Sequence, residues 1–484
     1  AWWNQAFDAA GYIDAFQVRI LPPDADPQDV RYNVVNWGDR LTRSWSYGGG
    51  VIDPRTGEII KGNVVLGALR VRQDVILYES LVGTAQENTG GPNDPVRIAL
   101  ARISQLGAHE VGHAIGFVHN FEGSTQDRTS VMDYPIARMN VMDGKIDLGD
   151  AYASGIGSWD KFTVDWLYGQ PQPGQDHDKA AAAKALAIQQ AGMRYMTDID
   201  GRSADLGVPG DSMWTDGADE APDLQHIMEV RRIAMNNFGP AVLRPGEALS
   251  NLRRKFVPMW LLHRYEIDAV GKLVGGVNYT YAVAGDGSAL PTPAAADKQE
   301  AALSALLATL SEKELTVPAR LLPLLSYGVN GRGDAQFDTE VLDTAGASAF
   351  DPLVAADVAA QVTLDSLLAP ARLTRVYLQH QNEASLLGVD ELVDKLIAAT
   401  LDGRSSAVGR RIAYRTLVSI ARAAHDKDMP GDIAAILTDK LHEQARGLAK
   451  VSGSGEDARW ARGTARMLED KDALARAIAP GAGK

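Results

Sequence analysis

The chain has 484 residues, of which 45% are hydrophobic and 23% charged, a composition typical of folded globular proteins rather than disordered or fibrous chains. Its length predicts roughly three domains. A net charge of −14 without a basic stripe excludes a broad nucleic-acid-binding surface. The absence of cysteine excludes disulfides and thiolate metal sites, so any metal must be bound through nitrogen or oxygen ligands.

The ends and the apolar runs of the chain bear on membranes and export. No apolar run approaches the ~18 residues that a membrane span needs, so no transmembrane segment is expected. The chain begins Ala1-Trp2-Trp3-Asn4, without a methionine or an apolar signal segment. We therefore interpret it as a mature or excised piece.

The first 170 residues mix helix and strand patterns. Helical spacing, alternation and turn residues predict, in chain order, a helix at Trp2–Ala10 ended by Gly11, strands at Phe16–Leu21 and Arg31–Trp37, and two strands within Gly48–Ile60 joined by a tight turn at Asp53–Gly57. The next segments, Asn63–Leu69 and Val71–Leu77, fit either a strand or a helix.

A long helix is expected to begin at Asp94-Pro95, because aspartate caps free amides and proline suits the first helical position. Gly116 is a plausible end for it. A second helix is predicted at Ser158–Tyr168, before Gly169. The apolar residues expected to form the buried face of the long helix are Leu100, Ile103, Gly107, Val111 and Ala114.

A polar Pro/Gly segment at Gln170–Asp178 is the best domain boundary in the sequence. We expect three parts: a domain at residues 1–170, a linking α/β segment at 171–290 and a helical accessory domain at 291–484. Helices are predicted at Leu252–Ala269, Glu300–Leu310, Val354–Leu368, Val389–Leu401, Ala407–Ala424, Asp432–Leu448 and Ala458–Ile478, with a strand-containing segment at Gly275–Val283.

The informative motif is His109-Glu110-Val111-Gly112-His113, on the predicted long helix. His109 and His113 lie four residues apart, so both imidazoles project from one face and can chelate one divalent cation. Glu110 is placed to reach a metal-bound water rather than the metal. Gly116 lets the chain turn sharply, so His119 can return as a third ligand and leave a fourth position open, as in catalytic zinc sites.

The same residues allow two other interpretations. Three surface or core histidines could fall in this register by chance, although only nine histidines occur in the chain. The site could also bind a metal without catalysis, but a structural site has no need of Glu110.

A second element follows at Met132-Asp133-Tyr134-Pro135. HExxHxxGxxH followed by such a methionine turn resembles the metzincin clan of zinc metallopeptidases. Within it, the turn at Ile52–Glu58, the HEVGH run and the MDYP run resemble large bacterial zinc-dependent metalloproteases that are usually exported. Asn120, after the third histidine, departs from the familiar metzincin families.

This resemblance implies an α+β metzincin-like catalytic domain, with a mixed twisted sheet and a zinc-bearing helix, followed by a mainly α-helical accessory region. It implies one catalytic Zn²⁺, Met132 as an apolar floor beneath the imidazoles, and Tyr134 as a zinc or oxyanion contact. It also implies an edge strand that aligns the substrate, for which Asn63–Leu69, with Asn63, Val64, Val65 and Leu66, is the candidate; an interior strand is the alternative for that segment.

The expected function is a zinc-dependent endopeptidase acting on peptide or protein substrates outside the cytoplasm, with Glu110 as general base. The alternatives are a catalytically silent binding or scaffolding protein, and a zinc hydrolase of a non-peptide amide. The acidic stretch from Asp198 to Asp223 could bind Ca²⁺, but it lacks the spacing of an EF-hand loop and fits a solvated loop better. Oligomeric state is left open.

Overall fold

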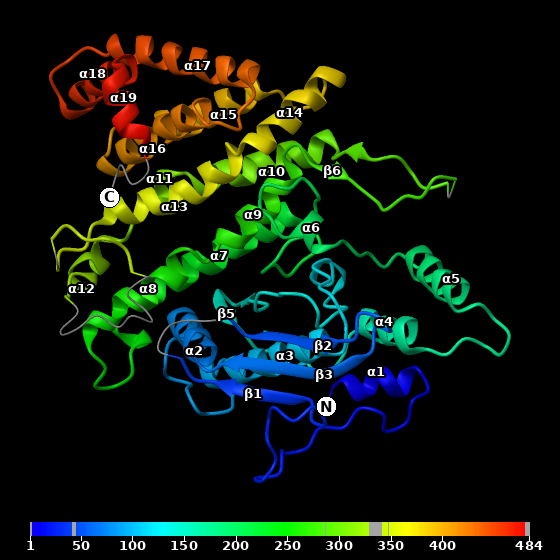
Figure 1. The fold of residues 1–484 in the computed structure, drawn as a ribbon. Coiled ribbons are helices and arrows are strands. Elements are labelled where there is room, and N and C mark those ends of the chain that lie inside the picture. The colour runs from blue at the N-terminus through cyan, green and yellow to red at the C-terminus, as the bar shows by residue number, and fades with distance from the viewer. Residues whose placement is uncertain (1, 41–44, 286, 329–340, 347, 480–484) are drawn as a thin grey trace.

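A three-stranded sheet forms the N-terminal part of the molecule (Figure 1). The computed structural model describes residues 2–40, 45–285, 287–328, 341–346 and 348–479. Strand order is β1-β3-β2, with β1 (Val34–Gly38) parallel and β2 (Tyr47–Ile52) antiparallel to the central β3 (Ile59–Gly67). The tight turn predicted between β2 and β3 is present, with the Gly57 amide donating to the Asp53 carbonyl at 2.8 Å.

Helix α3 (Pro95–Ala114) packs against β2 and β3 and begins as the sequence predicts. The Asp94 side chain accepts a hydrogen bond from the Val96 amide at 2.9 Å. Strand and helix approach so closely that a Cβ at Gly48 would lie 1.8 Å from the Glu110 carbonyl oxygen. The glycine run of β2 is therefore what brings the strand against the second half of α3.

Two local predictions need correction, and one open alternative is resolved. Phe16–Leu21 forms no strand, because it lies outside the sheet and has no ladder partner there. Asn63–Leu69 is mostly β3, whereas Val71–Leu77 lies within α2 (Leu69–Val82). Leu100 was expected on the buried face of α3 but is 55% exposed. That face is instead formed partly by polar residues, including Arg102 and Gln105, which an apolar pattern cannot reveal.

Helix α4 (Ser158–Tyr168) has the predicted bounds and packs against α1 (Trp3–Ala9). At its first turn, the buried Asp160 accepts hydrogen bonds from the Ser130 hydroxyl and the Val131 amide, at 2.7 and 2.8 Å. This contact ties α4 to the segment that precedes Met132.

The rest of the chain is mainly helical, as predicted, and lies above the sheet region in Figure 1. The sequence missed α7 (Glu220–Asn237) and α14 (Pro370–Asn382). It also joined α8 (Leu252–Trp260) with α9 (Arg264–Leu273), and α18 (Glu456–Glu469) with α19 (Lys471–Ile478), although each is a separate helix. The helices are α5 (His177–Gln190), α6 (Asp198–Gly201), α7 (Glu220–Asn237), α8 (Leu252–Trp260), α9 (Arg264–Leu273), α10 (Ala296–Thr309), α11 (Glu312–Leu315), α12 (Leu322–Leu325), α13 (Pro352–Leu367), α14 (Pro370–Asn382), α15 (Val389–Leu401), α16 (Ala407–Ala424), α17 (Gly431–Ala449), α18 (Glu456–Glu469) and α19 (Lys471–Ile478).

Two short hairpins complete the secondary structure: β4 (Asn140–Met142) pairs with β5 (Lys145–Asp147), and β6 (Val277–Asn278) pairs with β7 (Thr292–Pro293). Strand β6 falls within the strand-containing segment predicted at Gly275–Val283, and its partner β7 lies beyond that segment.

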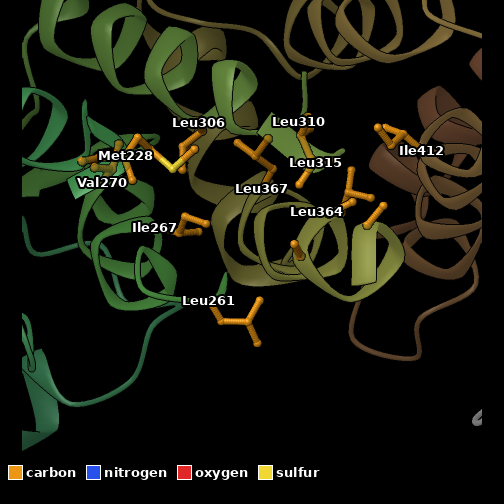
Figure 2. Packing of buried hydrophobic residues seen from close by; sticks show 14 of the residues in the cluster. Met228, Leu261, Ile267, Val270, Leu306, Leu310, Leu315, Leu364, Leu367 and Ile412 are labelled. Atoms are coloured by element: carbon orange, nitrogen blue, oxygen red, sulfur yellow. The ribbon is translucent and has the colours of Figure 1, made fainter. Parts of the chain in front are cut away.

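One apolar cluster connects these helices. It extends from Tyr78 in α2 to Leu468 in α18, and Figure 2 shows its middle, where Met228, Ile267, Leu306 and Leu364 come from four different helices. Smaller clusters lie under α3, one of them around Trp3 and Met132. The three-part division of the chain stays a prediction.

Among the described residues, no single helix is both long and apolar enough to cross a membrane. The bent pair α13 and α14 reaches that limit only when both helices are taken together.

Candidate metal centre

Three imidazoles converge at the end of α3. The Nε2 atom of His113 lies 3.1 Å from Nε2 of His109 and 3.1 Å from Nε2 of His119. In the described part of the chain, these residues are the one group of three His, Asp or Glu side chains whose ligand atoms all lie within 4.8 Å of one another. The structure therefore brings together the three histidines that the motif predicts as ligands.

The outer nitrogen of each ring faces an acceptor. His109 Nδ1 lies 2.9 Å from the Val131 carbonyl oxygen, and His113 Nδ1 lies 2.8 Å from that of Phe117. His119 Nδ1 lies 2.9 Å from both carboxylate oxygens of Asp198. Since an acceptor at Nδ1 places the proton there, the Nε2 lone pairs of all three rings point at one another.

Such a set of lone pairs fits a zinc ion. Tetrahedral Zn²⁺ binds imidazole nitrogen at ~2.0–2.1 Å, which puts ligand nitrogens a little over 3 Å apart, close to the spacing seen here. Burial also keeps the rings neutral: it lowers the pKa of His109 well below its ordinary value and that of His119 to about 4. Neutral imidazole is the form that binds metals.

The turn after α3 explains how His119 reaches the other two rings. Gly116 has φ +99°, a left-handed conformation that L side chains rarely adopt. The Phe117 amide donates to the Gly112 carbonyl at 3.0 Å and so closes the turn. Gly116 thus makes the sharp turn after α3 that the sequence predicts.

Met132 packs directly beneath α3, as an apolar floor requires. It is 1% exposed, and a Cβ at Gly112 would lie 2.2 Å from its sulfur atom. The Asn120 amide donates to the Met132 carbonyl at 3.1 Å, which ties the methionine turn to the residue after the third histidine.

Tyr134 reaches the same centre from the methionine turn. Its hydroxyl lies 3.0 Å from Nε2 of His119, and its ring stacks on Trp214 with centroids 5.1 Å apart. Burial raises the pKa of Tyr134, so the phenol keeps its proton and can donate it in a hydrogen bond.

Glu110 lies beside the cluster, between α3 and β2. It is 3% exposed and lies against Gly48 of β2, whose backbone favours the charged form of the carboxyl group. Burial raises its pKa to about 7, against the opposing effect of Arg102. A carboxyl group with this pKa can both accept and return a proton near neutral pH.

Asp198 and Arg202 complete the site, and the motif did not predict them. Besides contacting His119, Asp198 pairs with Arg202 at 2.8 Å, and the Arg202 guanidinium lies 5.8 Å from the centroid of the Tyr134 ring. Asp198 lies 79 residues after His119. In the sequence, Asp198 stood out only as part of the acidic stretch from Asp198 to Asp223, which suggested a possible calcium site.

The predicted substrate strand is wrong. Asn63, Val64, Val65 and Leu66 lie in β3, the central strand, whose backbone is paired with β1 on one side and β2 on the other. A central strand cannot take a further strand beside it. In the described sheet β1 and β2 are the edge strands, and of these two it is β2 that packs against the zinc-motif helix. Alternation alone does not tell a central from an edge strand.

The acidic stretch suggested for calcium is dispersed. Asp200 accepts from the Tyr281 hydroxyl and the Thr197 side chain, and Asp219 pairs with Lys298. Asp216 pairs with Arg128 and Arg138. No three of its carboxylates converge among the residues that the structure describes.

Comparison with known proteins agrees with this geometry. The sequence model of a family described as Met-zincin matches residues 91–406, about two thirds of the chain, including all three histidines, Glu110 and the methionine turn. No curated protein and no solved structure gives a significant match. The chain therefore belongs to the Met-zincin family and is a metzincin-clan zinc metallopeptidase by family.

Proposed function

We propose that the protein is a zinc-dependent endopeptidase in which Glu110 is the general base. The observation that carries this proposal is the position of the buried carboxyl group of Glu110 beside three imidazoles whose Nε2 lone pairs converge. A purely structural zinc site has no use for such a group.

When bound, zinc lowers the pKa of a coordinated water toward ~7 and polarises a carbonyl group. Glu110 takes the proton of the attacking water and later gives it to the leaving amine. The Tyr134 hydroxyl donates a hydrogen bond to the carbonyl oxygen as negative charge develops on it. Asp198 holds the His119 ring in the orientation and tautomer that a ligand needs.

The substrate backbone would lie along β2. An extended peptide can add to an edge strand through main-chain hydrogen bonds. Because Gly48 in β2 contacts Glu110, a peptide bound there passes next to the base. Location outside the cytoplasm belongs to the proposal and rests on the resemblance to exported bacterial metalloproteases.

The proposal is tested by Glu110→Gln. The variant keeps the shape and the Gly48 contact but cannot accept a proton. We expect zinc at one ion per chain and a fall in cleavage of a denatured protein mixture by about 100-fold or more, the scale of a lost general base. Glu229→Gln, on the exposed face of α7, is the matched control and should cleave normally.

The same assay separates the alternatives. Unchanged cleavage by Glu110→Gln would refute the role of this residue. Stoichiometric zinc without cleavage in the wild-type protein would favour a silent binding protein or a hydrolase of non-peptide amides. Cleavage that is abolished by a chelator and by a hydroxamate, and restored by zinc, would support the peptidase.

A further inference from the structure

A cavity of about 220 Å³ lies between the extended segment that follows the methionine turn and helices α7 and α9. It begins two residues beyond Tyr134 and is separate from the histidine cluster. Its walls come from Ile136–Asn140, the 210–217 loop, α7 and α9. The apolar part of the wall is formed by Ile136, Ala137, Met139, Ile227 and Ala269.

The polar part of this wall is strongly acidic. One of its carboxylates, Asp216, is neutralised by Arg128 and Arg138. The other three are Glu220, Asp223 and Glu266, and no Lys or Arg in the described part of the chain forms an ion pair with them. The wall also contains Arg138, whose guanidinium is paired with Asp216, and the exposed His226, whose Nε2 contacts the Met139 carbonyl at 2.6 Å.

Glu266 is the least satisfied of these groups. It is 3% exposed, and neither of its carboxyl oxygens has a hydrogen-bond partner among the described residues. The Ser212 hydroxyl, also in the wall, is buried and unpartnered too. Leaving a buried polar group unpaired destabilises the fold, and leaving a charged one unpaired does so more strongly. Burial and the nearby Asp223 raise the pKa of Glu266 to about 8, as expected where negative charge lacks a counter-ion.

The arrangement suits an organic cation better than a metal ion. A metal needs several oxygens around one point, and no three carboxylates here converge in that way. The acceptors are instead spread over α7, α9 and the 210–217 loop, and the rest of the cavity wall is largely apolar. A guanidinium group offers five donors in a planar fork, on a stem that packs against apolar side chains.

We propose that this cavity binds the guanidinium group of an arginine-type ligand, with Glu266 as its principal acceptor and Ser212, Glu220 and Asp223 around it. The group can be supplied by free arginine or by an arginine side chain of a peptide. This inference does not depend on the proposed peptidase activity, because binding is measured without turnover.

The test is calorimetric titration of the full chain with N-acetyl-arginine amide. The matched ligand is N-acetyl-citrulline amide, which has nearly the same shape but carries no charge. We expect the arginine compound to bind and the citrulline compound to bind at least 10-fold more weakly. Free arginine and a Gly-Arg-Gly peptide, compared in the same way, show which source of the group is preferred.

Variants place the binding in the cavity. Glu266→Gln should weaken arginine binding by about 10–100-fold, the scale of one hydrogen bond to a charged group. Asp268→Asn removes a carboxylate from the same helix outside the cavity wall and should bind like wild type. If Glu266→Gln does not fold, Asp223→Asn takes its place, with a loss of about 10-fold expected.

Three results would overturn the proposal: no binding of the arginine compound, equal binding of the citrulline compound, or unchanged binding by both wall variants. A rise in thermal stability with calcium chloride but not with arginine would assign the cavity to a metal ion instead.

Discussion

The segment Met132–Asn140 contributes to both the histidine cluster and the acidic cavity. The two sites satisfy their polar groups in opposite ways. In the cluster, each imidazole has a partner at Nδ1, so the three Nε2 lone pairs are fixed before any ligand arrives. In the cavity, Glu266 is buried without a partner. A site with its outer contacts complete is preorganised for one small ion, whereas a site with missing contacts requires its ligand to supply the donors.

The largest effect should come from removing one imidazole. We expect His113→Ala to lose stoichiometric zinc after dialysis, together with all cleavage, because two imidazoles remain where a catalytic zinc site has three protein ligands. His442→Ala, in an exposed position on α17, should keep one zinc per chain. Metal analysis gives the zinc content per chain of both variants. Full zinc occupancy in His113→Ala would show that the histidine cluster is not the metal site.

Loss of the tyrosine hydroxyl should come next. Tyr134→Phe should keep zinc but lower kcat by about 100-fold, with little change in KM, if the hydroxyl acts only as charge develops on the carbonyl oxygen. An equal change in both constants, or none, would assign Tyr134 to packing against Trp214 instead.

A smaller effect is expected from the outer contact of His119. Asp198→Asn should weaken zinc affinity by about 10–100-fold, because a carboxylate behind the ring makes the ligand more basic and fixes its orientation. Asp200→Asn, on the same short helix but facing Tyr281, is the control. Competition with a chromogenic chelator gives the affinities, and identical values for the two variants would show that the cluster does not depend on Asp198.

The smallest effect concerns the acidic cavity: its buried carboxyl group Glu266 should make the stability of the protein depend on pH. Burial raises the pKa of Glu266 to about 8 and that of Asp211 to about 7, so between about pH 6.5 and 8 the folded chain holds protons that the unfolded chain has released. Stability should therefore fall as pH rises through this window, by at most about 1.4 kcal/mol per pH unit for each proton.

Two other kinds of group define the edges of that window. Burial lowers the pKa of histidines such as His263, so they make stability rise with pH only below the ordinary histidine pKa of 6.5. Burial also lowers the pKa of Lys272 to about 8, so this residue makes stability rise with pH only above about pH 8. Urea denaturation at both ends of the window measures the slope. Glu266→Gln should flatten it, and a slope that this variant leaves unchanged would contradict the buried, protonated state of Glu266.

How much the sequence could predict follows from how local each signal is. The zinc ligands, Glu110, Gly116 and Met132 lie within 24 consecutive residues, and helical spacing and a glycine turn fix their geometry. Helices with clear caps, such as α3 and α4, were also predicted at or near their true ends.

What failed depended on distant partners. The order of strands in the sheet is set by a parallel pairing of β1 with β3, which alternation within β3 cannot reveal. Asp198 meets His119 only because the chain returns after α5, and the cavity takes its carboxylates from two helices, one of which, α7, had no clear pattern of its own. Leu100 was misplaced because the buried face of α3 includes the polar residues Arg102 and Gln105 as well as apolar ones, so an apolar pattern alone does not locate it.

The distance along the chain from His119 to Asp198 has a consequence for biosynthesis. During translation, all three histidines and the methionine turn are synthesised before Asp198, the residue that contacts the His119 ring. A nascent chain would thus carry the zinc motif for some time without its final support. The third imidazole would therefore gain its outer contact only after the segment around Asp198 has emerged from the ribosome.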